Sequence, residues 1–174
     1  MGASERREQI QEILKQSRQP VSAGALALRL GVSRQVIVGD VALLRASNVP
    51  IAATPRGYTL HAERFPGGAE YTIACRHSEE NMREELYTIV DNGCGVLDVT
   101  VDHAVYGQIS GQLQIFSRFD VDDFMKKLSQ SNAMPLSGLT GGVHLHTISC
   151  PSREAYERVL RALAEKGILL EKDE

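Results

Sequence analysis

The sequence predicts an α+β protein of two domains, a small helical one followed by a larger one in which helices are layered on a mixed sheet. Two observations support this prediction: a helix, glycine, helix pattern in the first third, and strands that alternate with helices in the remainder. A stretch with a proline and two glycines separates them. The predicted boundaries are residues 1–61 for the first domain, 62–70 for the linker and 71–174 for the second domain.

The composition of the 174 residues bounds the class of protein. No run of about 18 apolar residues occurs, so we expect neither a transmembrane helix nor a membrane partner. The charged N-terminus lacks the apolar core of a secretory signal, and three cysteines without a CxxC pair are typical of a reducing compartment. These features together predict a cytoplasmic protein.

Charge is divided unevenly along the chain. Residues 1–60 carry eight Lys or Arg and four Asp or Glu, whereas residues 61–174 carry eleven and eighteen. The first third is therefore positive and the rest negative, which favours contact between the first domain and a polyanion such as nucleic acid.

Three helices are expected in the first domain. Ser4 is the predicted cap of a helix over residues 4–17, Ser22 of one that ends before Gly31, and Ser33 of the third. Gly31 stands where a helix commonly ends in a left-handed conformation. The inward positions of the third helix have helical spacing and are Ile37, Val41 and Leu44. Two helices joined by a glycine turn are typical of a helix-turn-helix.

In such motifs the N-terminal end of the last helix enters the major groove of DNA. Side chains that can bind bases or phosphates occur there and at the tip of a predicted hairpin, the wing, over residues 49–60. The predicted DNA contacts are Ser33, Arg34, Gln35, Val38, Arg45 and Arg56. A three-helix bundle that makes only protein contacts is the alternative at this point.

The second domain shows alternating strand and helix patterns. Strands are expected over residues 71–77, 94–105, 106–116, 143–150 and 168–172, and helices over residues 78–93, 120–130 and 152–167. Ser78 and Asp120 are the predicted caps of the first two helices. Adjacent strands also pair directly, which favours a mixed sheet over a doubly wound parallel one. No GxGxxG or Walker A motif is present, so nothing indicates nucleotide binding.

Two histidines, His144 and His146, lie one residue apart in an apolar strand, so both imidazoles point to the same face. Buried imidazoles without partners would cost about 1–3 kcal/mol each, which favours a bound partner. Together with His77 and Glu85 they provide enough ligands for zinc, nickel or iron, with open positions on an octahedral ion. Histidines that serve only as polar core or surface residues are the alternative.

Three neighbouring residues leave this ligand set open. Cys75 shares a strand face with His77, and Cys150 shares one with the histidine pair. Each cysteine could be a soft metal ligand or simply a small buried side chain. Glu84 is adjacent to Glu85, and because a helix turns by about 100° per residue only one of the two can face the site.

The stretch LGVSRQVIVGDVALLRASN resembles the winged helix-turn-helix of biotin-ligase-type regulators. A bifunctional biotin ligase is excluded, because the remaining chain is too short and has neither a tryptophan nor a GRGR-like loop. With VDHAVYGQI and SGLTGGVHLHTIS added, nearly the whole chain resembles the niacin-responsive transcriptional repressors, whose C-terminal module is called the three-histidine (3H) domain.

This resemblance implies a divalent zinc, nickel or iron site whose ligands are His77, Glu85, His144 and His146. His103 would lie in an effector pocket, where Tyr106 could flank the ring of nicotinic acid, and Ala104 stands where a common form of the motif has proline. The resemblance further implies a homodimer that binds a double-stranded DNA operator. It would repress genes of NAD biosynthesis or niacin uptake, with nicotinic acid as co-repressor.

Two other functions stay open at this point: a repressor for which the metal ion itself is the signal, and a metal-dependent enzyme. No side chain stands out as a catalytic base beside the predicted ligands, and the attached DNA-binding domain favours sensing over catalysis. We therefore expect a regulator and not an enzyme.

Overall fold

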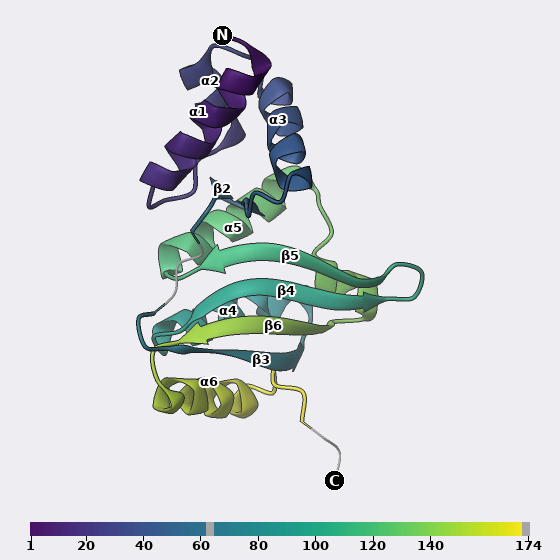
Figure 1. Ribbon diagram of the computed structural model, residues 1–174. Helices are drawn as coiled ribbons and strands as arrows, with labels where there is room; N and C mark the ends of the chain where they lie inside the picture. The colour runs from purple at the N-terminus through teal and green to yellow at the C-terminus, as the bar shows by residue number, and fades with distance from the viewer. Residues whose placement is uncertain (62–64, 172–174) are drawn as a thin grey trace. The chain divides into compact units, whose positions relative to one another are not determined.

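The computed structural model describes residues 1–61 and 65–171, and the chain divides into two compact units between residues 62 and 63 (Figure 1). The predicted linker, residues 62–70, begins outside the described residues. It ends inside a strand, because β3 runs over Ala69–Arg76.

The first unit consists of three helices and a short hairpin. Its helices are α1 (Ala3–Gln16), α2 (Ala23–Leu30) and α3 (Arg34–Ala46), and its strands are β1 (Ala52–Thr54) and β2 (Gly57–Thr59). The strands pair antiparallel, and Val21 adds an isolated bridge to Tyr58. The predicted winged helix-turn-helix is therefore confirmed.

Serine side chains set the starts of α2 and α3. Ser22 accepts a hydrogen bond from the backbone N–H of Ala25 at 3.0 Å, and Ser33 accepts one from Val36 at 3.3 Å. Gly31, between the two helices, has a φ of +66°, the left-handed conformation expected at this turn.

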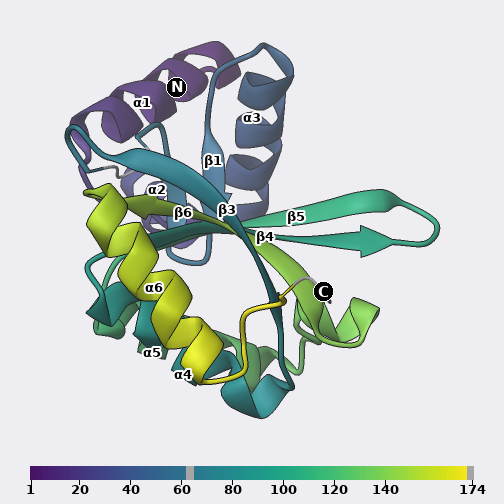
Figure 2. The same cartoon turned by 90° about the horizontal axis from the view of Figure 1, so that it is seen from below.

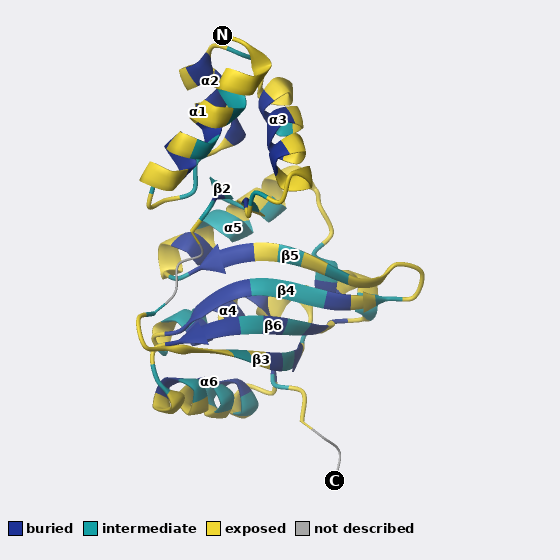
Figure 3. Ribbon diagram, viewed as in Figure 1, coloured by how far each residue is buried: buried dark blue, intermediate teal, exposed yellow. Residues whose placement is uncertain are grey.

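The apolar sides of the three helices meet in one core, visible in Figure 3 as the dark blue segments of α1 and α3. Its fully buried residues include Ile10, Leu14, Leu26, Ile37 and Val41. This core also contains a polar contact that the sequence pattern did not predict. Asp40 of α3 is buried and accepts a hydrogen bond from Arg6 Nε of α1 at 2.5 Å, an ion pair that ties the two helices together.

The second unit contains a four-stranded sheet in the order β3-β6-β4-β5, with β4 over Gly95–His103, β5 over Gly107–Ile115 and β6 over Val143–Cys150. Each neighbouring pair is antiparallel. The α+β class is confirmed, but the predicted mixed sheet is wrong. β3 and β4 run in the same direction, and β6 inserts between them and opposes both, so no parallel pair forms.

Three helices cover one face of this sheet: α4 (Met82–Asp91), α5 (Arg118–Ser131) and α6 (Arg153–Glu165) (Figure 2). Two 3₁₀ turns, η1 (Glu79–Asn81) and η2 (Leu136–Thr140), lie in the connections. All three helices share one core with the strands, and its buried members include Leu86, Val121, Val159, Val96 and Ile148.

The last predicted strand is reduced to a short edge contact. Leu169 forms an isolated antiparallel bridge with Cys75, and the backbone N–H of Leu170 donates to the carbonyl of Ala74 at 2.9 Å. The segment after α6 therefore covers the outer edge of β3.

Three predicted helix caps are wrong. Ser4 lies inside the first turn of α1, and Ser78, which precedes η1, makes no cap hydrogen bond with its side chain. Ser117 caps α5 by accepting from the backbone N–H of Asp120 at 3.1 Å, while the Asp120 carboxylate accepts from the N–H of Phe116 at 2.9 Å. Asp120 thus supports the helix start from inside the first turn.

Candidate metal centre

The strand register brings the predicted ligands to one face of the sheet. In the β3–β6 pair, His144 lies opposite Cys75 and His146 lies opposite Ile73. Residues that pair across antiparallel strands point to the same side, so both imidazoles face the layer of helices. His77 follows the end of β3 by one residue, and α4 supplies Glu85 from above the sheet.

All three imidazoles converge on the Glu85 carboxylate. Nε2 of His77 lies 2.5 Å from Oε2, Nε2 of His144 lies 2.8 Å from Oε1, and Nε2 of His146 lies 3.3 Å from Oε1. Glu85 is only 1% exposed and the two β6 histidines are each 3% exposed. These four residues are called the histidine cluster below; three of them are buried, and His77 is half-buried at its edge.

The opposite ring nitrogen of each imidazole is held by a backbone carbonyl. Nδ1 of His77 donates to Ser78 O at 2.6 Å, Nδ1 of His144 to Gly142 O at 2.8 Å, and Nδ1 of His146 to Asp98 O at 2.7 Å. Because a carbonyl oxygen only accepts, the proton of each neutral imidazole resides on Nδ1. Each Nε2 then presents a lone pair to the centre of the cluster.

Lone pairs that face a carboxylate repel it unless a positive charge lies between them. The Nε2 atom of His146 is an example, because it is buried near the carboxylate and has no hydrogen-bond partner among the described residues. Either protonation of the rings or a bound cation resolves the conflict. The donor set, three imidazole nitrogens and a carboxylate, is suited to zinc, nickel or iron.

Without a metal ion, the cluster shifts the acid–base properties of its members. Burial alone would raise the pKa of Glu85, but the neighbouring histidines hold that pKa well below its usual range. Burial opposes charge on His77 and His146 too, yet their interaction with the Glu85 carboxylate raises the pKa of each. The metal-free cluster therefore favours an ionised Glu85 beside protonated His77 and His146.

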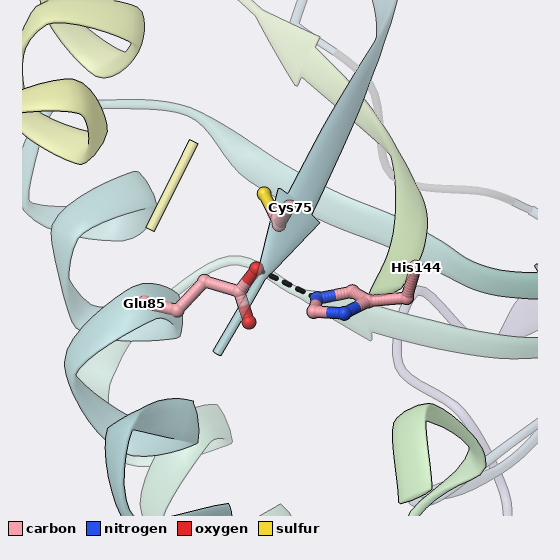
Figure 4. Close-up of side chains that lie close together, drawn as sticks. All are labelled: Cys75, Glu85 and His144. Atoms are coloured by element: carbon pink, nitrogen blue, oxygen red, sulfur yellow. Dashed lines mark hydrogen bonds and ion pairs between the residues drawn. The ribbon is translucent and has the colours of Figure 1, made fainter. Parts of the chain in front are cut away.

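The structure also shows where Glu84 and Cys75 lie relative to the cluster, which the sequence left open. Glu84 points away from the cluster and forms an ion pair with Lys166. Figure 4 shows Cys75 beside Glu85 and His144, and its Sγ lies with their donor atoms in a group spanning at most 4.8 Å. Burial, together with the nearby carboxylate, raises the pKa of the Cys75 thiol.

Cys150 lies outside the histidine cluster, although it shares the strand face of His146. It sits at the far end of β6, where its thiol interacts with the thiol of Cys94; both cysteines are free and buried. Its position is that of a small core residue.

A glycine that the sequence did not single out supports the cluster. Gly142 has a φ of +96°, and its carbonyl accepts from His144 Nδ1. A Cβ at this position would lie 2.3 Å from the carbonyl oxygen of His77. In the sequence, the doublet Gly141-Gly142 before the histidine pair could have indicated this role. Close packing excludes a side chain only at the second of these glycines.

His103 and Tyr106 lie at the turn of the β4–β5 hairpin. Nδ1 of His103 accepts from the backbone N–H groups of Val105 and Tyr106 at 3.1 and 3.2 Å, and the two rings are 5.2 Å apart. Tyr106 is 78% exposed. The structure therefore brings these two residues together at the hairpin, and their role in effector binding stays a prediction.

The predicted DNA contacts divide into exposed and partly buried residues. Arg34, Gln35 and Arg45 are exposed on α3, and the Ser33 side chain is used as its cap. Val38 is half-buried and packs against the core, and its contact with DNA stays a prediction. At the wing, Arg56 is half-buried and donates from Nη1 to Gln19 Oε1 at 3.1 Å.

Comparison with known proteins decides the family. Residues 6–59 match the model of an HTH domain and residues 70–172 match that of the 3H domain. Over 98% of its length, the chain is 46% identical to Transcription repressor NadR of Bacillus subtilis, covering 95% of that protein. It is 44% identical to Probable transcription repressor NiaR of Thermotoga maritima, over 96% of this chain and 94% of that protein.

The chain belongs to the niacin-responsive repressor family.

The repressor is thus a DNA-binding transcription regulator and not an enzyme. Its HTH match covers all three helices and the wing, which confirms the choice of DNA binding over a bundle used only for protein contacts. Among the described residues, no helix is both long and apolar enough to cross a membrane.

Proposed function

We propose that this chain is a homodimeric repressor of genes for NAD biosynthesis or niacin uptake, acting in the cytoplasm with nicotinic acid as its co-repressor. A divalent transition metal held by the histidine cluster would form part of the effector site. The observation on which the proposal depends is the convergence of three Nε2 atoms on the buried Glu85 carboxylate, with every Nδ1 already bound to a carbonyl.

That arrangement fits a metal ion for two reasons. The ring orientations are fixed by backbone carbonyls, which is the usual support of metal-binding histidines. The unpartnered Nε2 of His146 points a lone pair into the cluster, where a cation would satisfy it. When bound, a divalent ion would supply positive charge and coordination positions for a small anionic ligand.

The effector would reach this site through a cavity of about 490 Å³ beside the cluster. The cavity is lined by His77, by the preceding Arg76 and by the loop around Gly141 and Gly142. Arg76 is exposed, and a guanidinium can bind a carboxylate such as that of nicotinic acid. His103 and Tyr106 are not among the lining residues, so their contribution requires a separate test.

Repression would follow from a shift between two states of the dimer. Helix-turn-helix dimers contact half-sites about 34 Å apart, so a small rotation between subunits changes the fit of both α3 helices. Nicotinic acid then strengthens DNA binding to the extent that it prefers the DNA-competent state. A coupling of about 1–3 kcal/mol would raise operator affinity roughly 5- to 150-fold.

Fluorescence anisotropy tests this proposal, using a DNA site selected from a random pool by the metal-loaded protein. Nicotinic acid is expected to raise affinity for this site, whereas nicotinamide, which lacks the carboxylate, has little effect. Equal DNA affinity with and without nicotinic acid would refute the co-repressor. Titrating metal at fixed nicotinic acid, and the reverse, separates this function from a repressor that senses the ion alone.

A His146→Ala variant tests the metal site. It should lose the metal ion and the response to nicotinic acid while its helix-turn-helix unit stays folded and binds DNA non-specifically. Leu145→Ala, a substitution at the neighbouring and half-buried position, is the matched control and should retain both properties. A His146→Ala protein with full metal content and a normal response would show that the site is misplaced.

A further inference from the structure

Cys75 places a thiol beside Glu85 and His144 of the histidine cluster, and it is not part of the ligand set implied by the family resemblance. It lies opposite His144 in the β3–β6 register, so their side chains emerge on the same face. Cys75 Sγ, one Glu85 oxygen and one His144 nitrogen lie within 4.8 Å of one another, and all three residues are buried (Figure 4).

The thiol is held at this place by backbone contacts on both sides of its strand. On one side β6 pairs with β3 along its length, and on the other Leu169 bridges Cys75 while Arg76 N–H donates to Ile168 O at 2.8 Å. Cys75 is 0% exposed, so its side chain is packed inside the protein beside the carboxylate.

A second, independent observation is a buried polar atom of the cluster that has no hydrogen-bond partner. The buried Nε2 of His146, which lies 3.3 Å from Glu85 Oε1, has no hydrogen-bond partner among the described residues. Glu85 links the two observations, because its carboxylate lies beside both the Cys75 sulfur and this nitrogen.

Charge balance favours a thiolate at the cluster. A divalent ion bound by three neutral imidazoles and Glu85 leaves one positive charge in a buried site, where unbalanced charge is costly. One thiolate cancels that charge. Two ligands at about 2.1–2.3 Å from a zinc ion lie roughly 3.3–3.8 Å apart, so a small side-chain adjustment closes the present 4.8 Å span.

We propose that Cys75 ligates the metal ion of this repressor as a thiolate, and that the site consequently selects thiophilic zinc over hard ions such as manganese. This inference rests on the proposed function, because it requires a metal ion at the histidine cluster. On binding, the S–H bond of Cys75 breaks, a sulfur–metal bond forms and the proton passes to solvent. Neither the metal nor the sulfur changes oxidation state. Soft thiolate ligands favour zinc, whereas carboxylate and water suit manganese.

Cobalt substitution of the full-length protein tests Cys75 directly. Cobalt(II) bound by a thiolate gives an intense near-ultraviolet charge-transfer band, which nitrogen and oxygen ligands do not give. The wild-type protein should show this band at one equivalent of cobalt, and Cys75→Ser should lose it while still binding cobalt. Cys94→Ser is the matched control, since it removes a buried thiol that pairs with Cys150 outside the cluster, and it should keep the band.

Metal selectivity gives a second measurement. Cys75→Ser should lower zinc affinity at least about tenfold, the scale on which even outer partners of metal ligands act, and leave manganese affinity within a few-fold. Different results would refute the Cys75 ligand and the metal-dependent function. Stoichiometric cobalt without the band, or a band that survives in Cys75→Ser, overturns the thiolate ligand alone. Absence of any cobalt binding overturns both this inference and the metal-dependent function.

Discussion

Glu85→Gln separates the two roles that the buried carboxylate has in the histidine cluster. The substitution keeps the size and shape of the side chain, but it removes the negative charge on which three imidazoles converge. One carboxylate oxygen, which accepts hydrogen bonds, is replaced by an amide NH2 group, which donates them. The effect on stability should depend on pH, because the carboxylate binds protonated rings and the amide binds neutral ones.

The magnitude follows from the contacts of Glu85. Its two hydrogen bonds, to His77 and His144, are charge-assisted when the rings are protonated and contribute about 1.5–3 kcal/mol each. Neutral replacements contribute about 0.5–1.5 kcal/mol each, so the net loss in the metal-free protein is roughly 2–3 kcal/mol at pH 6. That range lies near the cost of breaking a buried ion pair, about 3–5 kcal/mol.

At higher pH the difference should shrink. The folded-state pKa of His77 and of His146 is raised, so the stability they contribute is complete below the unfolded value of about 6.5. It is lost as pH rises through the folded-state pKa. As His77 and His146 lose their protons with rising pH, a glutamine N–H can donate to an Nε2 lone pair. The variant should then be within about 1 kcal/mol of wild type.

Urea unfolding of EDTA-treated protein at pH 6 and pH 9 measures these differences. Glu84→Gln is the matched control, because Glu84 is the exposed neighbour on the same helix, and its effect should stay within about 0.5 kcal/mol at both pH values. Zinc titration of Glu85→Gln should also show at least a tenfold loss of affinity, as expected when a metal partner is removed. Equal destabilisation by both variants, or unchanged zinc affinity in Glu85→Gln, would refute this account of the cluster.

Three further predictions concern the metal, the loop and the DNA. Zinc affinity measured by competition with a chromophoric chelator should rise from pH 6 to pH 8, because protons on the raised-pKa histidines compete with the ion; a flat profile would contradict this. Gly142→Ala should lower zinc affinity by displacing His77, whose carbonyl oxygen would lie 2.3 Å from the new Cβ. Gly141→Ala, with open space around its Cβ, should cost about 1 kcal/mol of stability and leave zinc affinity unchanged. Arg45→Gln should reduce the salt dependence of DNA binding by about one unit of slope, whereas Arg34→Ala should relax sequence preference; equal effects on all DNA sequences would place Arg34 on the phosphate backbone.

The predictions that succeeded from sequence depend on local geometry. Ser22 and Ser33 cap their helices because each stands one residue before an apolar helical pattern, and Gly31 adopts the left-handed turn that its position indicated. The failures at Ser4 and Asp120 have a local cause as well. Each lies inside a first helical turn that begins earlier than expected, and the neighbouring sequence offers several polar residues with similar capping tendency.

The sheet could not be predicted from the same kind of pattern. Strand alternation places residues on faces, but it does not specify which strand lies next to which. β6 inserts between β3 and β4 through contacts with residues roughly 45 to 80 positions earlier in the sequence, and this insertion makes the sheet antiparallel throughout. No spacing within β3 or β4 reports that arrangement.

The sequence by itself determined the winged helix-turn-helix, the shared face of His144 and His146, and the choice of histidines and acidic residues as candidate ligands, because these follow from periods of two or 3.6 residues. Only the tertiary structure decided that Glu85 faces the site and Glu84 does not, and that Cys75 lies beside Glu85 and His144. The packing of α4 over the sheet and the register of β6 against β3 fix those outcomes. Both depend on the burial of side chains far apart in sequence, which no local pattern encodes.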